Sequence, residues 1–221
     1  VWPQYETNRA FRYAHGDRDA TEAAFAKAAH VARLTLVNNR LVTNYMETRG
    51  AVGEYDAASG RYTLTVGSQG GHSMKGIIAA DVLKVDPDRL RVVTPDVGGG
   101  FGTKIFVYPE YPLVLVAAER LGRPVKWIST RQEAFQSDSQ GRDNITEAEA
   151  AMDEAGRFTA LRVDLKANMG AYLHPFAPHI PWVGTTMAPG LYDIPTMHVL
   201  IDGVYTNTVP VDAYRGAGRP E

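Results

Sequence analysis

The sequence predicts an α+β fold in which helices pack on mixed sheets. Segments that alternate with the period of a strand are interspersed with apolar runs at helical spacing, without the strict strand–helix repeat of a parallel α/β protein. Of the 221 residues, 44% are hydrophobic and 10% are aromatic, which is enough to form a substantial buried core. We therefore expect an ordered chain of one large domain or two small ones.

Composition excludes several classes of protein. The formal net charge of −2, from 23 basic and 25 acidic residues, shows no bias toward nucleic acid or acidic membranes. The absence of cysteine excludes disulfides, thiolate zinc sites, iron–sulfur ligation and a cysteine nucleophile within these residues. There is no secretory signal, and no apolar run approaches the roughly 20 residues of a membrane span, so we expect a cytoplasmic protein. We also expect a piece of a longer polypeptide, since there is no initiating Met and the sequence stops inside a glycine-rich turn.

The first elements follow from capping and periodicity. Asp19-Ala20-Thr21-Glu22 has the capping-box pattern, and apolar residues at helical spacing then predict a helix over about 20–30. Alternation of branched and polar residues predicts a strand over 31–37. A turn-rich connection joins residues 51–55 to 61–66, which predicts a hairpin whose second strand has one buried face.

The middle of the sequence predicts helices on both sides of a short strand. An apolar run over 73–83 predicts a helix, and the apolar segment 90–93 predicts a strand. Residues 111–121 are apolar at helical spacing, and Gly122 before Pro124 predicts the end of that helix.

The remaining elements are predicted by the same criteria. They are a strand over 125–128, a polar connection or helical turn over 131–137, a hairpin of strands over 144–152 and 158–167, an irregular proline-rich segment over 170–191, and a strand over 196–201.

A glycine loop follows the strand at 90–93, with glycine at four of the five positions 98–102. Between a strand and a helix, its N–H groups would form a concave nest that binds an anion or an oxygen-rich ligand. A tight turn packed against neighbouring backbone explains the same pattern, and both interpretations stay open. Thr103 stands where the Walker and dinucleotide motifs each require another glycine, so neither motif is present.

Four other residues can each be interpreted in two ways. Gln69 ends a strand just before a helix, where α/β ligand sites form, but satisfied turn residues also occur there. Arg215 lies in a second glycine-containing turn and can serve an anionic ligand or a surface turn. Glu47 and Arg49 are either functional or form an ion pair that holds a loop.

Two kinds of site are not favoured. His174 and His179 are five residues apart, which is not the spacing of a helical metal site, so we predict no metal bound by protein side chains. Ser68 is followed by His72, but no acidic partner or nucleophile elbow accompanies them, so a serine hydrolase is not predicted.

Taken in order, these features resemble the molybdopterin-binding large subunit of the xanthine dehydrogenase, aldehyde oxidase and carbon monoxide dehydrogenase family, over about 20–221. The segments that carry the resemblance are Gly99-Gly100-Phe101-Gly102 with Lys104, Ala213-Tyr214-Arg215-Gly216-Ala217-Gly218-Arg219, Ser68-Gln69, and Asn38-Asn39-Arg40-Leu41-Val42 with Met46-Glu47-Thr48-Arg49. In the last of these, Thr48 replaces the family's usual proline.

The resemblance implies a cofactor and a site. It implies molybdopterin cytosine dinucleotide with molybdenum, and partner subunits that carry a [2Fe–2S] cluster and FAD, which suits a chain without cysteine. The cofactor-binding residues it implies are Gln69, Gly99, Gly100, Phe101, Gly102, Ala213 and Arg215. The 221 residues would form the first molybdopterin-binding domain, while the second domain and the family's catalytic Glu lie beyond Glu221.

Two departures bear on the substrate. Ile105 follows Lys104 where purine-oxidising members carry Glu, and Gly216 stands where the carbon monoxide enzymes carry Cys. By analogy we expect a carbon monoxide dehydrogenase-like hydroxylase that acts instead on an aldehyde or N-heterocycle, with this fragment inactive alone. The alternative is a cofactor-free binding or scaffolding domain of the same fold.

Overall fold

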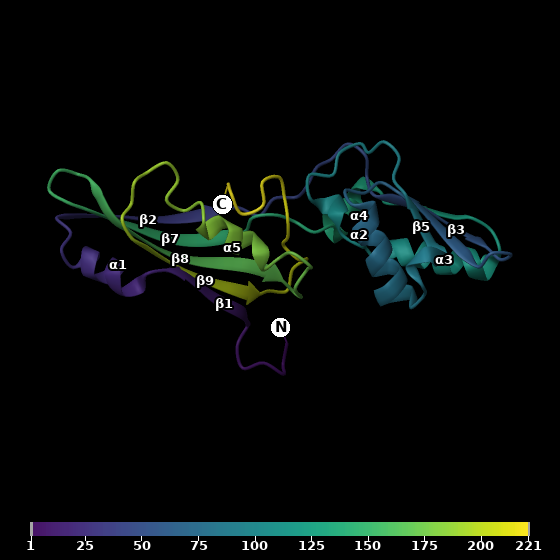
Figure 1. Ribbon diagram of the computed structural model, residues 1–221, viewed down its shortest axis with the longest axis horizontal. Helices are drawn as coiled ribbons and strands as arrows, with labels where there is room; N and C mark the ends of the chain where they lie inside the picture. The colour runs from purple at the N-terminus through teal and green to yellow at the C-terminus, as the bar shows by residue number, and fades with distance from the viewer. Residues whose placement is uncertain (1, 221) are drawn as a thin grey trace. The chain divides into compact units, whose positions relative to one another are not determined.

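The computed structural model describes residues 2–220 and divides into two compact units. The discontinuous unit contains the chain up to Val42 and again from Ser139 onward, and the inserted unit spans Thr43–Asp138. Figure 1 shows both, and each is described by itself. The inserted unit contains the glycine loop, whereas the second glycine-containing turn belongs to the discontinuous unit.

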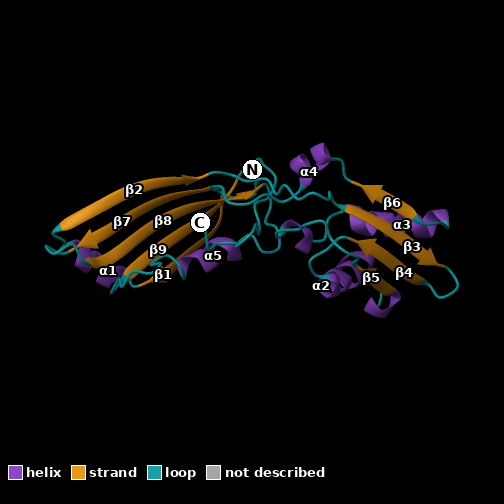
Figure 2. Cartoon of the chain, turned by 90° about the horizontal axis from the view of Figure 1, so that it is seen from above, coloured by secondary structure: helices purple, strands orange, loops and turns teal. Residues whose placement is uncertain are grey.

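The discontinuous unit is built on a five-stranded sheet with the order β1-β9-β8-β7-β2, in which only β8 and β9 run parallel (Figure 2). The strands are β1 (Arg9–Gly16), β2 (His30–Asn38), β7 (Asn144–Met152), β8 (Phe158–Gly170) and β9 (Met197–Tyr205). Two short helices accompany the sheet, α1 (Arg18–Phe25) and α5 (His179–Thr185). The core on one face contains Val163, Val199 and Ile201, against which Trp182 of α5 packs.

The inserted unit has a four-stranded sheet with the order β5-β4-β3-β6. Its strands are β3 (Gly50–Asp56), β4 (Arg61–Val66), β5 (Leu90–Val93) and β6 (Val125–Ile128), of which β4 and β5 are parallel. Its helices are α2 (Gly71–Gly76), a π-helix (Ile77–Leu83), α3 (Glu110–Leu121), α4 (Arg131–Ser137) and the 3₁₀ turns Pro87–Arg89 and Thr103–Ile105. Helix α3 packs so closely on β3 that a Cβ at Gly53 would lie 2.5 Å from the backbone of Val114.

Most of the local predictions are confirmed. The hairpin of β3 and β4 forms, and Tyr62, Leu64 and Val66 give β4 the buried face that its alternation predicts. The α+β class is confirmed, as are β5 and β6 over the predicted residues. Helix α3 ends at Gly122, whose left-handed φ of 61° is the conformation that glycine adopts without a Cβ clash.

The first predicted helix was wrong at both ends. Helix α1 covers Arg18–Phe25 rather than 20–30, because Asp17 caps it by accepting a hydrogen bond from the Ala20 N–H at 2.9 Å. Residues after Phe25 instead lead into β2, which begins at His30.

Two further predictions need correction, and one strand was missed. The segment 170–191 is not irregular throughout, because α5 forms in it, with Pro181 in the first turn where helix N–H groups have no intrahelical partner. The helix predicted over 73–83 starts at Gly71 and continues as a π-helix. Strand β1 was not predicted at all, since its partner β9 lies at the other end of the chain.

Among the helices that the structure describes, none combines the length and apolar character that a membrane crossing requires.

Candidate functional site

The glycine loop (residues 98–102) leads from β5 into the 3₁₀ turn Thr103–Ile105. The predicted nest at a helix N-terminus is wrong in one respect. Helix α3 begins only at Glu110, after Pro109, so the glycines do not cap it. The loop must therefore be organised by other groups than a long helix.

The backbone of the glycine loop adopts left-handed conformations. The φ angles are 94° at Gly99, 51° at Phe101 and 105° at Gly102. Such angles are easy for glycine but uncommon for phenylalanine, and strained residues of this kind cluster at functional sites. Because the Phe101 residue is also 43% exposed, this conformation presents an aromatic ring to solvent.

Gln69 organises the loop through its side chain. Its Oε1 accepts hydrogen bonds from the N–H groups of Gly102 at 2.9 Å and Lys104 at 3.3 Å, while its own N–H donates to the Lys104 carbonyl. The oxygen end of the amide is thereby assigned, because only an oxygen accepts from N–H. In the described part of the chain the Nε2 group of Gln69 has no partner, and the residue is exposed.

Two backbone donors of the loop also stay open. Within residues 2–220, the N–H groups of Gly99 and Gly100 donate to no acceptor, although Gly100 is buried. Space here is restricted, because a Cβ at Gly100 would lie 2.4 Å from Oε1 of Gln69. The loop thus offers two N–H donors and one side-chain amide for a polar, flat ligand, and a side chain at Gly100 would disturb this arrangement.

An ion pair between Glu47 and Lys104 also holds the glycine loop. Nζ of the fully buried Lys104 lies 2.7 Å from Oε2 of Glu47 and also donates to the Glu47 carbonyl at 2.9 Å. The same Oε2 accepts from the Gly98 N–H at 3.0 Å, and the Glu47 N–H donates to the Gly98 carbonyl. The hydrogen bond from Lys104 is the main cause that lowers the pKa of Glu47 below its ordinary value of 4.5.

Arg49 forms ion pairs of its own, not with Glu47. Its buried guanidinium contacts Asp138 at 2.6 Å and Glu110 at 3.0 Å, and lies 3.7 Å from the ring centroid of Tyr108. These contacts join α3 and α4, which indicates a structural role.

The second loop, which we call the arginine loop (residues 213–219), begins beside a buried carboxylate. Asp212 accepts from the Ala213 N–H with Oδ1, and with Oδ2 from the Phe176 N–H at 3.0 Å. The same Oδ2 lies 2.7 Å from Nδ1 of His174, so this histidine is engaged in holding the loop. The φ angles from Arg215 to Gly218 are all positive, at 24°, 108°, 36° and 86°.

The structure thus brings five of the predicted residues together in the inserted unit, namely Gln69, Gly99, Gly100, Phe101 and Gly102. Ala213 and Arg215 lie together in the arginine loop of the discontinuous unit, with Arg215 exposed. Within the residues that the structure describes, no cluster of three or more potential metal-ligating side chains occurs.

Comparison with known proteins adds a decisive observation. Residues 1–221 match the family model described as "Molybdopterin cofactor-binding domain". The chain belongs to this family.

Relatives of this molybdopterin cofactor-binding domain are large subunits. It is 34% identical over 209 residues to the carbon monoxide dehydrogenase large chain of Hydrogenophaga pseudoflava, covering 94% of this chain and 26% of that protein. It is 33% identical over 216 residues to the nicotine 6-hydroxylase large subunit of Paenarthrobacter nicotinovorans, covering 94% of this chain and 25% of that one. The chain therefore spans about a quarter of the length of these relatives.

A solved structure agrees in fold. The domain superposes on quinoline 2-oxidoreductase from Pseudomonas putida 86 with a TM-score of 0.88 and 32% identity, over 96% of this chain and 27% of that one. The mixed sheets and packed helices are thus also the fold of the matching part of quinoline 2-oxidoreductase.

Sequence reasoning missed one buried residue of this domain. Arg142 lies behind the arginine loop and donates to its carbonyl groups. The polar run Gln140-Gly141-Arg142-Asp143-Asn144 was a signal for an unusual turn, and Arg142 and Asp143 do have positive φ angles of 65° and 71°. The arginine loop lies about 70 residues later in the sequence, so no local pattern could predict that Arg142 contacts it.

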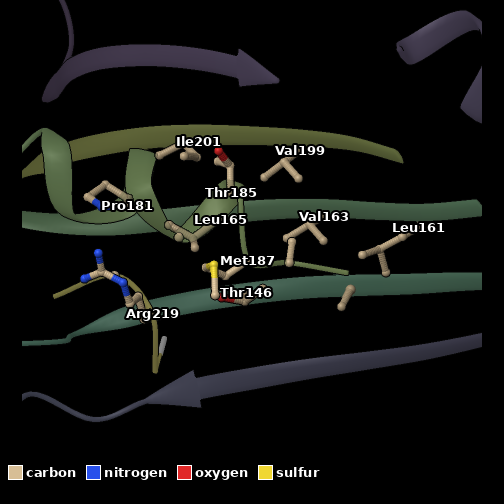
Figure 3. Close-up of a pocket in the computed structure, with 14 residues that line it drawn as sticks. Thr146, Leu161, Val163, Leu165, Pro181, Thr185, Met187, Val199, Ile201 and Arg219 are labelled. Carbon is tan, nitrogen blue, oxygen red and sulfur yellow. The ribbon is translucent and has the colours of Figure 1, made fainter. Parts of the chain in front are cut away.

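A pocket of about 210 Å³ was also not predicted. It lies in the discontinuous unit, between one face of β7, β8 and β9 and the segment of α5 (Figure 3). Val163, Leu165 and Ile201 make its floor apolar, and Arg219 of the arginine loop stands at its side. The arginine loop therefore adjoins a space that apolar groups can fill.

Proposed function

We propose that the full-length protein is a molybdenum hydroxylase and that this chain supplies part of its cofactor site. The residues proposed to contact the cofactor are Gln69, Gly99, Gly100, Phe101, Gly102, Ala213 and Arg215. One observation carries the proposal. Among the described residues, the N–H groups of Gly99 and Gly100 and the nearby Nε2 of Gln69 have no hydrogen-bond partner. No catalytic residue is proposed within the chain, and the general base is expected in a later domain.

The glycine loop fits a pterin for a steric and a chemical reason. A pterin is flat and has polar ring edges, so it needs donors that are not shielded by side chains. Cβ atoms at Gly99 and Gly100 would lie 2.9 Å from the Phe101 ring and 2.4 Å from Gln69, so only glycine leaves this arrangement intact. When bound, the molybdenum cofactor would supply the oxidation of a substrate carbon, with water as the source of oxygen.

The cytosine dinucleotide is the proposed form of the cofactor. The dinucleotide joins a nucleoside phosphate to the phosphate that the pterin already carries, and a guanidinium such as that of the exposed Arg215 binds phosphate well. The positive φ angles that follow Arg215 also suit backbone N–H donation to an anion. The arginine loop therefore suits a phosphate-bearing cofactor, and the cytosine form is proposed from the family resemblance.

The proposed substrate is an aldehyde or an N-heterocycle. The names of two relatives specify nicotine and quinoline, which are both N-heterocycles. Gly216 provides no thiol at the position where the resemblance places the cysteine of carbon monoxide enzymes, and Ile105 provides no carboxylate for a purine. Gly216 therefore argues against carbon monoxide oxidation, and Ile105 argues against a purine substrate.

The proposed partners are an iron–sulfur subunit and a FAD subunit in a cytoplasmic complex. A chain without cysteine provides no thiolates for a cluster, so electrons would leave through another chain. The subunit wording in the names of relatives is consistent with such an assembly.

Purification of the full-length protein from its native host tests the proposal. We expect about one molybdenum per large subunit by metal analysis, together with cytidine monophosphate after acid hydrolysis. Adenosine or guanosine monophosphate in its place would correct the cofactor form alone. A protein that co-purifies with partners but contains neither molybdenum nor pterin would overturn the proposal and favour the scaffolding function.

A further inference from the structure

The buried Arg142 contacts the backbone of the arginine loop. Nη1 of Arg142 donates to the Tyr214 carbonyl at 2.7 Å, and Nη2 donates to the Arg215 carbonyl at 3.2 Å. The guanidinium carbon also lies 5.2 Å from the ring centroid of Tyr214. One planar cation therefore holds two consecutive carbonyl groups, and its fork geometry suits such a pair.

This contact determines the direction of the neighbouring N–H groups. In a planar trans peptide the C=O and N–H bonds point in opposite directions, and the described chain contains no cis peptide. Carbonyls turned toward Arg142 therefore turn the N–H groups of Arg215 and Gly216 to the opposite side of the loop. In the described residues the Gly216 N–H donates to no acceptor, and Gly216 is exposed.

The position of Arg142 is itself fixed by its neighbours. A Cβ at Gly141 would lie 2.4 Å from Cβ of Tyr214, so the two segments are in direct contact. On the other side, Oδ2 of Asp143 accepts from Arg40 and from Asn168, each at 2.7 Å. The left-handed turn at Arg142 is therefore held from both sides.

We infer that Arg142 is a positioning residue, which orients the backbone N–H groups of the arginine loop toward an anionic or oxygen-rich group of the cofactor. Successive N–H groups in residues with positive φ form the concave anion sites known as nests. Arg142 acts through the loop and does not itself contact the cofactor. The inference rests on the proposed function, because it assigns the loop to that cofactor.

The test uses the full-length protein with Arg142→Met and Arg142→Lys. Amide hydrogen exchange is measured on protein from cells grown without molybdate, and molybdenum and pterin content on protein from cells grown with it. We expect exchange over 213–219 to become about tenfold faster in Arg142→Met, because two charge-assisted hydrogen bonds are lost. We expect cofactor content to fall by a similar factor, with Arg142→Lys intermediate, while exchange over 98–104 stays unchanged.

Arg33→Met is the matched control, because Arg33 is an exposed arginine of β2 in the same unit whose ion pair is with Glu149. It should leave both measurements at the wild-type level. Unchanged exchange over 213–219 in Arg142→Met overturns the inference, as does faster exchange with full cofactor content. If Arg142→Met does not fold, Arg142→Lys decides by the same two criteria. Wild-type protein without any molybdenum would refute the proposed function separately, because the exchange experiment does not need the cofactor.

Discussion

Gln69 and Arg142 hold the two loops of the proposed site by opposite ends of the peptide group. Glu47 and Gln69 accept hydrogen bonds from N–H groups at both ends of the glycine loop. Arg142 and Arg219 instead donate to carbonyl groups of the arginine loop. Side-chain acceptors therefore hold the ends of the glycine loop, whereas the arginine loop is held by two arginines in addition to the Asp212 carboxylate at its start.

This difference shows how side-chain chemistry selects the groups that a loop leaves available. In the glycine loop the anchors use the N–H groups at its ends, and within residues 2–220 the central donors of Gly99 and Gly100 remain open. In the arginine loop Arg142 uses the carbonyls of Tyr214 and Arg215, so the N–H groups of those two peptides face away from Arg142. Both arrangements present donors, as an electron-rich cofactor requires.

The largest effect is expected from Gly100→Ala in the glycine loop. The new Cβ would lie 2.4 Å from Oε1 and 2.7 Å from Cδ of Gln69, which displaces this side chain and its hydrogen bonds. We expect the molybdenum content of the full-length protein to fall at least about tenfold. Loss of a hydrogen bond between Gln69 and the loop leaves an N–H group unsatisfied, and a cost of about 1.4 kcal/mol corresponds to a tenfold loss of binding.

Gly76→Ala is the matched control for Gly100→Ala. Gly76 has a helical φ of −59°, and a Cβ there would meet no atom within 4 Å. This variant should keep its cofactor and gain about 0.5–1 kcal/mol of stability. Equal cofactor content in the two variants would show that the close packing around Gly100 is not needed for binding.

A smaller effect is expected from two variants of Gln69, which test the Oε1 and Nε2 groups of its side chain separately. Gln69→Ala leaves the N–H groups of Gly102 and Lys104 without their acceptor. The free energy of unfolding should therefore fall by about 1–3 kcal/mol, and the cofactor content should also fall. Gln69→Glu keeps an acceptor but loses the Nε2 donor, so it should keep its melting temperature and lose cofactor. Gln136→Glu on the exposed side of α4 is the control, and cofactor retained by Gln69→Glu would show that Nε2 is not a ligand.

A still smaller effect concerns pH and Glu47. Because the folded-state pKa of Glu47 is lowered below 4.5, its ionised form stabilises the loop above pH 4.5, and this contribution is lost as the pH falls through the folded-state pKa. Hydrogen exchange at Gly98 should therefore be slower in wild type than in Glu47→Gln at pH 7. This difference in exchange rate between the two proteins should disappear as the pH falls through the folded-state pKa of Glu47. A difference that is constant from pH 7 to below 4.5 would contradict the role of the carboxylate.

The smallest effect is expected from Arg219→Ala in the arginine loop. Arg219 is exposed, and its side chain holds the Gly216 carbonyl with a single hydrogen bond at 3.1 Å. We expect a change in stability below about 0.5 kcal/mol and cofactor content within about twofold of wild type. A loss as large as that of Arg142→Met would show that the loop is held equally from its exposed side.

Local patterns predicted the elements that need only local information. The alternation in β4 identified its buried face, and Gly122 identified the end of α3, because both signals lie within a few residues of the structure they specify. The dense glycines likewise identified the glycine loop. At the start of α1 the capping-box pattern placed the cap at Asp19, and this local signal was wrong because Asp17 caps the helix.

The amino-acid sequence by itself determined the α+β class, most strands, the two loops and, through its motifs, the family to which the chain belongs. Tertiary structure decided that Gln69 meets the glycine loop from 33 residues away in sequence, and that Arg142 meets the arginine loop from 72 residues away. The physical reason is that these contacts join residues far apart in the sequence. Periodicity records which face of an element is buried, whereas the partner of a donor or an acceptor depends on the path of the whole chain.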